Sequence, residues 1–273
     1  MFLAVEVVIG MRPVLFRSCL LPALVALGAG CAGVPSSRYS TASRPAICPP
    51  QAIVFVLDGV GNFGTTSTSL RDAIEESGLP LYVQTVEWSH GYGRVFADHL
   101  DNCHARNEGR KLAAQIACYQ QPRADGQPLP VYLVAHSGGS AVALAATEWL
   151  PPGSVERIVL LAPSVSADYD LRPALRCSRL GIDVFHSQRD VLALGLGVAV
   201  LGTADRQRTA AAGRVGFRPP DDCSADAALY LKLRQYPWDP CVAWTGHLGG
   251  HEGAHHRRFL RAYVLPLLTE RGT

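Results

Sequence analysis

The sequence has little charge and no cluster of one sign. Only 18% of its 273 residues are charged, the formal net charge is +2, and no Lys- or Arg-rich run occurs. Because the chain has no concentrated basic face to bind phosphate groups, nucleic acid is excluded as a partner. The chain also lacks a Cys-x-x-Cys pair, which argues against a zinc site built from thiolates. Its hydrophobic content of 48% is enough for the core of one domain of ordinary α/β size.

A long apolar run is missing from the N-terminal region as well. The apolar stretch at residues 19–29 falls short of the ~20 residues that span a bilayer. Two arginines precede this stretch and small residues follow it, which is typical of a secretory signal peptide. Residues 1–30 are therefore predicted to be a signal. Met11 is the expected start, and residues 1–10 would then be an upstream extension.

The end of this signal, Leu27-Gly28-Ala29-Gly30-Cys31, resembles a bacterial lipoprotein signal, in which the cysteine becomes the lipidated first residue of the mature protein. Gly28 departs from the leucine that is usual at that place. Simple cleavage around residues 29–32 is the alternative. Both routes predict export. In the first case Cys31 would anchor the protein to a bacterial membrane in the cell envelope, and in the second the protein would be periplasmic or secreted.

The segment after the signal, residues 31–50, is rich in Ser, Pro and Ala and has no periodicity, so we expect a flexible tether. The folded domain is expected at 51–273. After Cys31 six cysteines remain, and an even number in an exported protein predicts disulfides. Six cysteines allow fifteen pairings, so the sequence fixes none, and buried free thiols are the alternative. These cysteines stand at positions 48, 103, 118, 177, 223 and 241.

From residue 51 onward, short β-branched or apolar runs alternate with longer helical patterns, which is typical of βαβ units. The pattern predicts an α/β fold with a mostly parallel, roughly six-stranded central sheet flanked by helices. Strands are expected at residues 52–58, 82–88, 130–136, 156–162, 181–187 and 241–246. Helices are expected after Ser69 up to Gly78, and at 97–120, 138–150 and 255–268.

The third expected strand runs into "VAHSGGS", so that a strand, a sharp turn carrying Ser137 and an Ala-rich helix follow one another directly. This is the context of a nucleophile elbow, in which a strained turn exposes the serine hydroxyl. Small residues must flank the serine so that strand and helix can pack closely, and Ala135 and Gly139 meet that need. The alternative is a serine that only caps the helix.

A serine hydroxyl needs a base to take its proton and a third group to orient that base. Asp190 follows the fifth expected strand, and several histidines follow the sixth. With this order, residues 51–270 resemble an α/β-hydrolase-fold serine esterase or lipase that lacks the first two strands of the full fold. The resemblance implies Ser137 as nucleophile, Asp190 as acid and His251 as base, with His247 as the alternative base.

The same resemblance implies an oxyanion hole formed by the backbone N–H of Gly138 and a second N–H from the loop after the first strand. Val60 is the expected second donor, with Gly61 as the alternative. That loop also matches the dinucleotide fingerprint G-x-G-x-x-G. A dehydrogenase would leave Ser137, Asp190 and the histidine-rich loop without a role, so we set that interpretation aside.

The histidine-rich loop contains "HEGAH" at residues 251–255, a literal match to the H-E-x-x-H motif of zinc peptidases. Gly253 weakens the helix that this motif requires. A third ligand would have to follow, and the extended form of the motif needs glycine and histidine where Arg258 and Arg261 stand. Zinc catalysis therefore stays an alternative to the serine mechanism.

These patterns together predict an exported serine hydrolase that cleaves small-molecule carboxylic esters through an acyl-enzyme, with no cofactor and no metal. A catalytically inactive binding lipoprotein on the same scaffold and a zinc-dependent peptidase that uses HEGAH are the alternatives. The segment at 163–180 is too short for a large helical lid, which predicts an open site.

Overall fold

The computed structural model describes residues 50–122, 126–191, 202–219 and 226–270, and these ranges belong to one structural unit of the chain, Pro45–Thr273. The predicted signal, Cys31 and nearly all of the predicted tether lie outside the described residues. No helix in the described ranges has the length and apolar character needed to cross a membrane.

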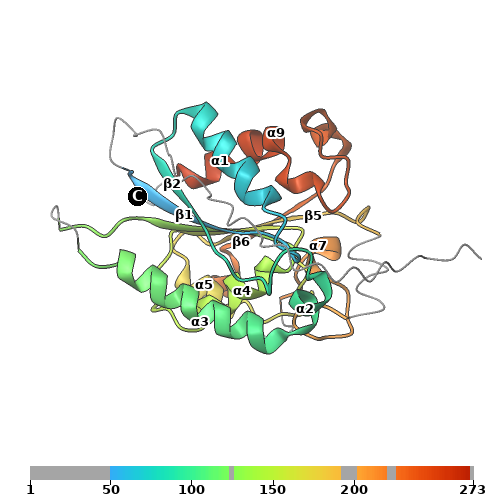
Figure 1. Ribbon diagram of the computed structural model, residues 1–273, viewed down its shortest axis with the longest axis horizontal. Helices are drawn as coiled ribbons and strands as arrows, with labels where there is room; N and C mark the ends of the chain where they lie inside the picture. The colour runs from blue at the N-terminus through green and yellow to red at the C-terminus, as the bar shows by residue number, and fades with distance from the viewer. Residues whose placement is uncertain (1–49, 123–125, 192–201, 220–225, 271–273) are drawn as a thin grey trace, which may run out of the picture. The chain divides into compact units, whose positions relative to one another are not determined.

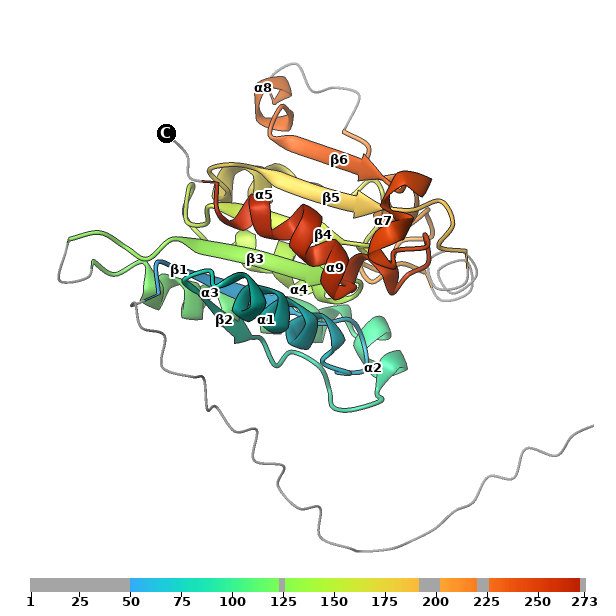
Figure 2. The same cartoon turned by 90° about the horizontal axis from the view of Figure 1, so that it is seen from above.

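The sheet has six strands, all parallel, in the order β2-β1-β3-β4-β5-β6. Figure 2 shows them side by side in this order. The strands are β1 (Ala52–Leu57), β2 (Leu81–Thr85), β3 (Val131–His136), β4 (Arg157–Leu161), β5 (Ile182–His186) and β6 (Leu233–Pro237). The predicted α/β fold, with a parallel, six-stranded central sheet flanked by helices, is therefore confirmed.

Five strands lie at the predicted places, but the sixth does not. Residues 241–246 were expected to form it, and they lie instead in a 3₁₀ helix, η2 (Pro240–Thr245), and its cap. Asp239 caps this helix by accepting the N–H of Cys241 at 2.7 Å. The true edge strand is β6, which pairs with β5. Its half-polar sequence, LRQYP, did not stand out as a strand.

Helices cover both faces of the sheet, and strand side chains alternate between them (Figure 1). On one face Ile53, Phe55 and Leu57 of β1 pack in a core with α3 and α4. On the other face Val54 and Val56 pack against α1 and the C-terminal helical segment. The larger helices are α1 (Thr65–Ser77), α2 (Val95–Leu100), α3 (Asn102–Tyr119), α4 (Gly139–Thr147) and α5 (Arg172–Cys177). The shorter segments are α7 (Ala212–Val215), α8 (Ala227–Tyr230), η3 (Gly253–His255), α9 (Arg257–Phe259), η4 (Leu260–Val264) and η5 (Leu265–Leu268).

The first helix begins earlier than predicted, at Thr65 rather than after Ser69. Asp58, the residue after β1, accepts hydrogen bonds from the first turn of this helix. Its Oδ1 accepts the N–H of Thr66 at 2.7 Å and the N–H of Ser67 at 3.1 Å. The predicted end at Gly78 is confirmed. This carboxylate places the start of α1 at the edge of the sheet where the candidate site lies.

Two other predicted helices are divided. The helix expected at 97–120 is α2 and α3, because Asp101 ends the first and caps the second by accepting the N–H of His104. The helix expected at 255–268 is a succession of short α, π and 3₁₀ segments. Pro266 stands in its path and cannot donate a helical hydrogen bond.

A charged group lies inside the sheet at Asp183 of β5, which is fully buried. Its carboxylate accepts hydrogen bonds from Arg157 at 2.8 Å, from Arg234 at 2.7 and 2.8 Å, and from the hydroxyl of Tyr236 at 2.9 Å. Burial raises the pKa of Asp183, but the hydrogen bonds from the two arginines outweigh it and leave the pKa below its ordinary value. The strands β4, β5 and β6 are therefore joined by ion pairs as well as by their backbones.

The predicted disulfides are not present among the cysteines that the structure describes. Cys103, Cys118, Cys177 and Cys241 are all free thiols. Positions 48 and 223 lie outside the described residues. In the segment 163–180, all of which is described, the only helix is α5, so the predicted absence of a large lid there is confirmed.

Candidate active site

Ser137 stands in the turn between β3 and α4, at the carboxyl edge of the sheet. Its φ is 49°, in the left-handed region that non-glycine residues rarely adopt, so the turn is strained. Its N–H is held by the carbonyl of Leu161 at the end of β4, at 3.0 Å. A Cβ on Gly139 would lie 2.6 Å from the carbonyl oxygen of Asp58, so the close approach of α4 to β1 requires glycine there. These are the features expected of a nucleophile elbow.

The structure brings Ser137, His251 and Asp190 together from three separate loops. His251 Nε2 lies 2.8 Å from Ser137 Oγ, and His251 Nδ1 lies 2.5 Å from Asp190 Oδ2. Asp190 follows β5 and is 2% exposed, while His251 follows η2 and is partly exposed. Both ring nitrogens of His251 therefore have partners, one a hydroxyl and the other a buried carboxylate. This arrangement suits an imidazole that takes a proton from the hydroxyl.

His247, the alternative base, faces elsewhere. Its ring packs edge-on against Phe259, and its Nδ1 accepts the N–H of Gly249 at 3.3 Å. A Cβ on Gly253 would lie only 1.9 Å from the same ring nitrogen, so the loop turns closely over this side chain. Burial lowers the pKa of His247 to about 4. His247 therefore has the surroundings of a core histidine.

The two amides expected to form an oxyanion hole lie on neighbouring loops. A Cβ on Gly138 would come within 2.6 Å of Val60 Cγ1, so the loop after β1 touches the elbow. The N–H of Gly61, the alternative donor, is already donated to Asp98 Oδ2 at 2.8 Å. This leaves the Val60 amide as the candidate from this loop.

Asp98, on α2, organises this loop and was missed by the sequence analysis. Besides the N–H of Gly61, its carboxylate accepts the Ser89 hydroxyl at 2.6 Å and the His90 N–H at 2.7 Å, and it lies 2.9 Å from His90 Nδ1. Burial raises the pKa of Asp98, but the hydrogen bonds from Ser89, Gly61 and His90 together bring it below the ordinary value. A single acid in a short helix carries no sequence pattern that would have revealed this role.

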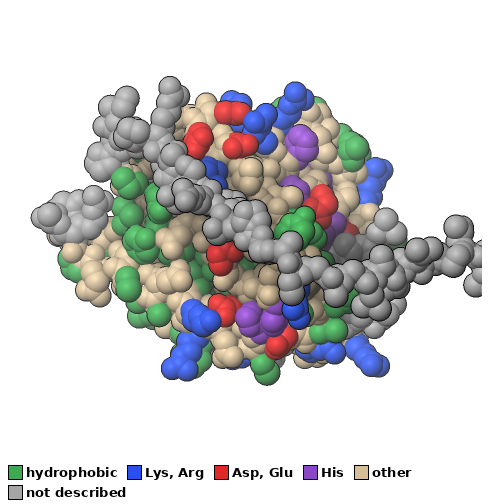
Figure 3. Space-filling model, in the orientation of Figure 1, with side chains coloured by type: hydrophobic (Ala, Val, Ile, Leu, Met, Phe, Trp, Pro, Cys, Tyr) green, Lys and Arg blue, Asp and Glu red, His purple; other side chains and the backbone are tan. Residues whose placement is uncertain are grey.

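A pocket of about 190 Å³ opens beside Ser137 and His251. Val60, Phe63 and Val95 contribute apolar surface to its wall. Figure 3 shows that basic and acidic side chains are mixed over the face in view, so neither sign dominates there. Its lining also includes Asp58 and Glu252 and no Lys or Arg, so the pocket suits a small acyl group that carries no negative charge.

The HEGAH segment does not form the helix that a zinc peptidase requires. Gly253–His255 is a single 3₁₀ turn, and His251 is engaged by Ser137 and Asp190 rather than paired with His255. Glu252 and His255 instead approach His136, the residue before Ser137. One potential ligand atom from each of these three side chains lies within 4.8 Å of the other two.

No protein-family model matches the chain, and no curated protein matches it. Among solved structures, the chain is similar to the esterase PE8, with 18% identity over 78% of this chain and 93% of that chain and a TM-score of 0.42. It is also similar to the catalytic core domain of an acetyl xylan esterase from Trichoderma reesei, with 13% identity over 81% of this chain and 99% of that chain and a TM-score of 0.41. A third similar structure is the pyrethroid hydrolase PytH, with 11% identity, 79% and 96% coverage and a TM-score of 0.37. With identities and scores this low, the fold is assigned from the chain's own strand order.

Proposed function

We propose that the chain is a serine hydrolase that cleaves carboxylic esters through an acyl-enzyme. The observation that carries this proposal is the continuous contact from Ser137 Oγ through the His251 ring to Asp190, at 2.8 and 2.5 Å. The serine stands on a strained turn beside a pocket, as a nucleophile would.

In the proposed reaction Ser137 Oγ attacks the ester carbonyl carbon while His251 Nε2 takes the hydroxyl proton. Asp190 accepts the Nδ1–H of the ring and stabilises the imidazolium that forms. The carbonyl oxygen gains negative charge, which the N–H groups of Gly138 and Val60 are proposed to bind. His251 then gives its proton to the leaving alkoxide as the C–O bond breaks. Water attacks the acyl-enzyme by the same route and restores the free serine.

The pocket of about 190 Å³ favours short acyl chains over long ones. Ligand pockets for drug-sized molecules run from about 300 to 1,000 Å³, so this space suits an acetyl or butyryl group. We expect p-nitrophenyl acetate and butyrate to be cleaved faster than the palmitate ester. Equal or faster cleavage of palmitate would contradict this size limit while leaving the serine mechanism intact.

Labelling with a fluorophosphonate probe tests the mechanism. We expect the wild type to react, Ser137→Ala to be silent and His251→Ala to react far more slowly. His247→Ala serves as the matched histidine control and should label like the wild type if it folds. A wild type that fails to label, although folded, would favour a binding protein without activity. Loss of labelling in His247→Ala, with labelling kept in His251→Ala, would reverse the assignment of the base.

We also propose that the protein is exported and anchored through a lipid on Cys31. The signal-like residues 1–30 and the small residues before Cys31 support this proposal. Growth of an expressing bacterial host with a labelled fatty acid should label the wild type and not Cys31→Ser. Cleavage without incorporation of the lipid would indicate an ordinary signal peptide instead.

A further inference from the structure

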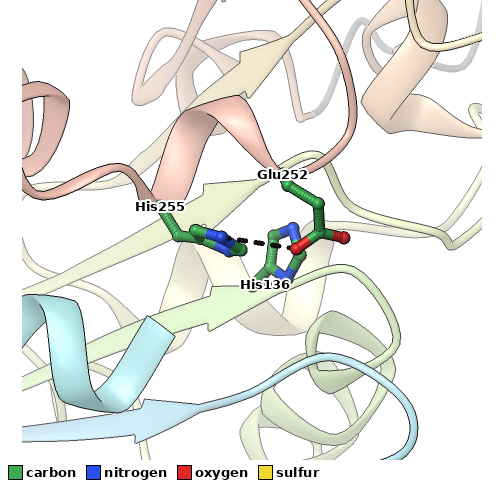
Figure 4. A group of neighbouring side chains, drawn as sticks. All are labelled: His136, Glu252 and His255. Atoms are coloured by element: carbon green, nitrogen blue, oxygen red, sulfur yellow. Dashed lines mark ion pairs between the residues drawn. The ribbon is translucent and has the colours of Figure 1, made fainter. Parts of the chain in front are cut away.

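We propose that His136, Glu252 and His255 form a binding site for a zinc ion next to the candidate triad. His136 ends β3, and the other two residues lie in the loop that follows η2, so the site joins two segments far apart in the sequence. Figure 4 shows the three side chains turned toward one another, and a ligand atom from each lies within 4.8 Å of the other two. The inference does not rest on the proposed esterase activity.

His136 offers an unused lone pair inside the protein. It is 2% exposed, and its Nε2 lies 3.2 Å from the carbonyl oxygen of His251, which can only accept. The proton therefore belongs on Nε2, and Nδ1 is left as an acceptor. Nδ1 is buried and has no hydrogen-bond partner. A histidine that donates one ring N–H to a carbonyl and keeps the other nitrogen free is typical of metal ligands.

The ring of His255 is also available to a metal, because each of its nitrogens makes only one weak contact. Its Nδ1 lies 3.4 Å from the Thr66 hydroxyl, and its Nε2 lies 3.3 Å from Glu252 Oε2. Both distances are long for hydrogen bonds of buried groups. Both rings are buried, and burial disfavours the charged form of an imidazole. Neutral imidazole is the form that binds a metal.

The charges around the site also favour a cation. In the described ranges neither Glu252 nor Asp58 forms an ion pair with a Lys or Arg side chain. Asp58 lines the pocket beside Ser137, as do His136 and Glu252. Its side chain is 3% exposed, and its Oδ2 has no hydrogen-bond partner. Two carboxylates beside two neutral imidazoles leave excess negative charge, which a divalent ion would balance.

Two imidazole nitrogens and one carboxylate oxygen match the donor sets of zinc rather than of calcium or magnesium. Tetrahedral zinc with bonds of about 2.1 Å places its ligands roughly 3.4 Å apart. The separation between Glu252 Oε2 and His255 Nε2 is already 3.3 Å, and the separations from His136, within 4.8 Å, must close by up to about 1.4 Å. Glu252 is exposed and can supply part of this movement. A bound ion would tie the end of β3 to the loop that carries His251.

Isothermal titration of the full chain, stripped of metals by a chelator, tests the site with Zn²⁺ and with Ca²⁺. We expect one Zn²⁺ to bind per chain and to raise the melting temperature, and Ca²⁺ to do neither. Glu252→Gln and His255→Gln should each weaken Zn²⁺ binding by at least the roughly tenfold that loss of an outer partner of a ligand costs. His256→Gln, at the exposed neighbouring position, is the matched control and should bind as the wild type does.

Ser137→Ala should keep the Zn²⁺ affinity of the wild type, which separates this site from the proposed hydrolase mechanism. The titration is read as heat and melting temperature, so it does not depend on any activity. Circular dichroism of each variant before the titration verifies that it is folded. Absence of stoichiometric Zn²⁺ binding by the wild type would overturn the proposal. Binding that both ligand variants retain unchanged would place the ion elsewhere and overturn it equally.

Discussion

Replacing Asp190 by Asn should nearly abolish catalysis while leaving the fold in place. The side chain keeps its size, but the carboxylate that lies 2.5 Å from His251 Nδ1 becomes a neutral amide. If the amide NH₂ faces the ring, the ring proton moves to Nε2. Nε2 lies 2.8 Å from Ser137 Oγ and could then no longer accept the serine proton.

The size of the loss follows from two terms. The charge of Asp190, about 4 Å from the centre of the imidazolium, stabilises it by about 4 kcal/mol at an effective dielectric constant near 20. That term alone corresponds to a roughly 10³-fold loss in rate, since each 1.36 kcal/mol is tenfold. The wrong tautomer adds to it, and the same substitution in a serine protease costs about 10⁴-fold. We expect kcat to fall by about 10³ to 10⁴.

The assay is the rate of p-nitrophenyl acetate hydrolysis, together with the rate of fluorophosphonate labelling. Asp168→Asn, an exposed acid outside the candidate site, is the matched control and should retain wild-type rates. Thermal melting monitored by circular dichroism verifies that the Asp190 variant is folded. A loss of less than tenfold in a folded Asp190→Asn variant would refute the role assigned to this carboxylate.

Three further predictions concern the scaffold of the site. Gly109→Ala should lower the free energy of unfolding, measured in urea, by about 1 kcal/mol. The new Cβ would lie 2.8 Å from Ala145 Cβ, and this steric clash outweighs the ~1 kcal/mol of helix propensity that alanine adds. A stabilised variant would contradict this prediction. Asp98→Ala should lower kcat about 10- to 100-fold with little change in KM, because the loop at Gly61 loses the carboxylate that accepts its N–H. Asp98→Asn should recover part of this loss. A change in KM alone would argue that Asp98 does not position this loop for catalysis. Because the pKa of Asp183 is lowered, its contribution to stability is complete above the ordinary carboxyl value of 3.8 and is lost as the pH falls through its lower folded-state pKa. Asp183→Asn should therefore reduce the loss of unfolding free energy at acid pH. The same acid-induced loss in the variant as in the wild type would contradict this prediction.

The sequence predicted the buried strands well because their signal is local and strong. Strands such as β1 and β3 are apolar on both faces, as parallel strands must be when helices cover both sides of the sheet. The edge strand β6 has Arg234 and Gln235 among its five residues, and its pairing with β5 comes from tertiary structure rather than from pattern. The more apolar segment after it was mistaken for the strand, although Pro240 and the Asp239 cap direct it into a 3₁₀ helix.

Ser137 and Asp190 could be anticipated because each follows the end of a parallel strand, and parallel strands bring those ends to one edge. His251 was anticipated from a strand expected at 241–246, and it lies instead in the loop after η2. The structure does place Ser137, Asp190 and His251 in contact. Partners defined only by distance could not be read from the sequence. Asp98 reaches Gly61 from 37 positions away, and His136 meets the His251 loop across more than a hundred.

The central claim is that Ser137 carries the acyl group during turnover, and mass spectrometry of the acid-quenched reaction tests it most directly. After brief mixing with p-nitrophenyl acetate, followed by acid quenching and proteolysis, the account predicts one acetyl group on the peptide that contains Ser137. The adduct should be absent from Ser137→Ala. An acetyl group on another side chain, or ester turnover by a folded Ser137→Ala variant at the wild-type rate, would contradict the account.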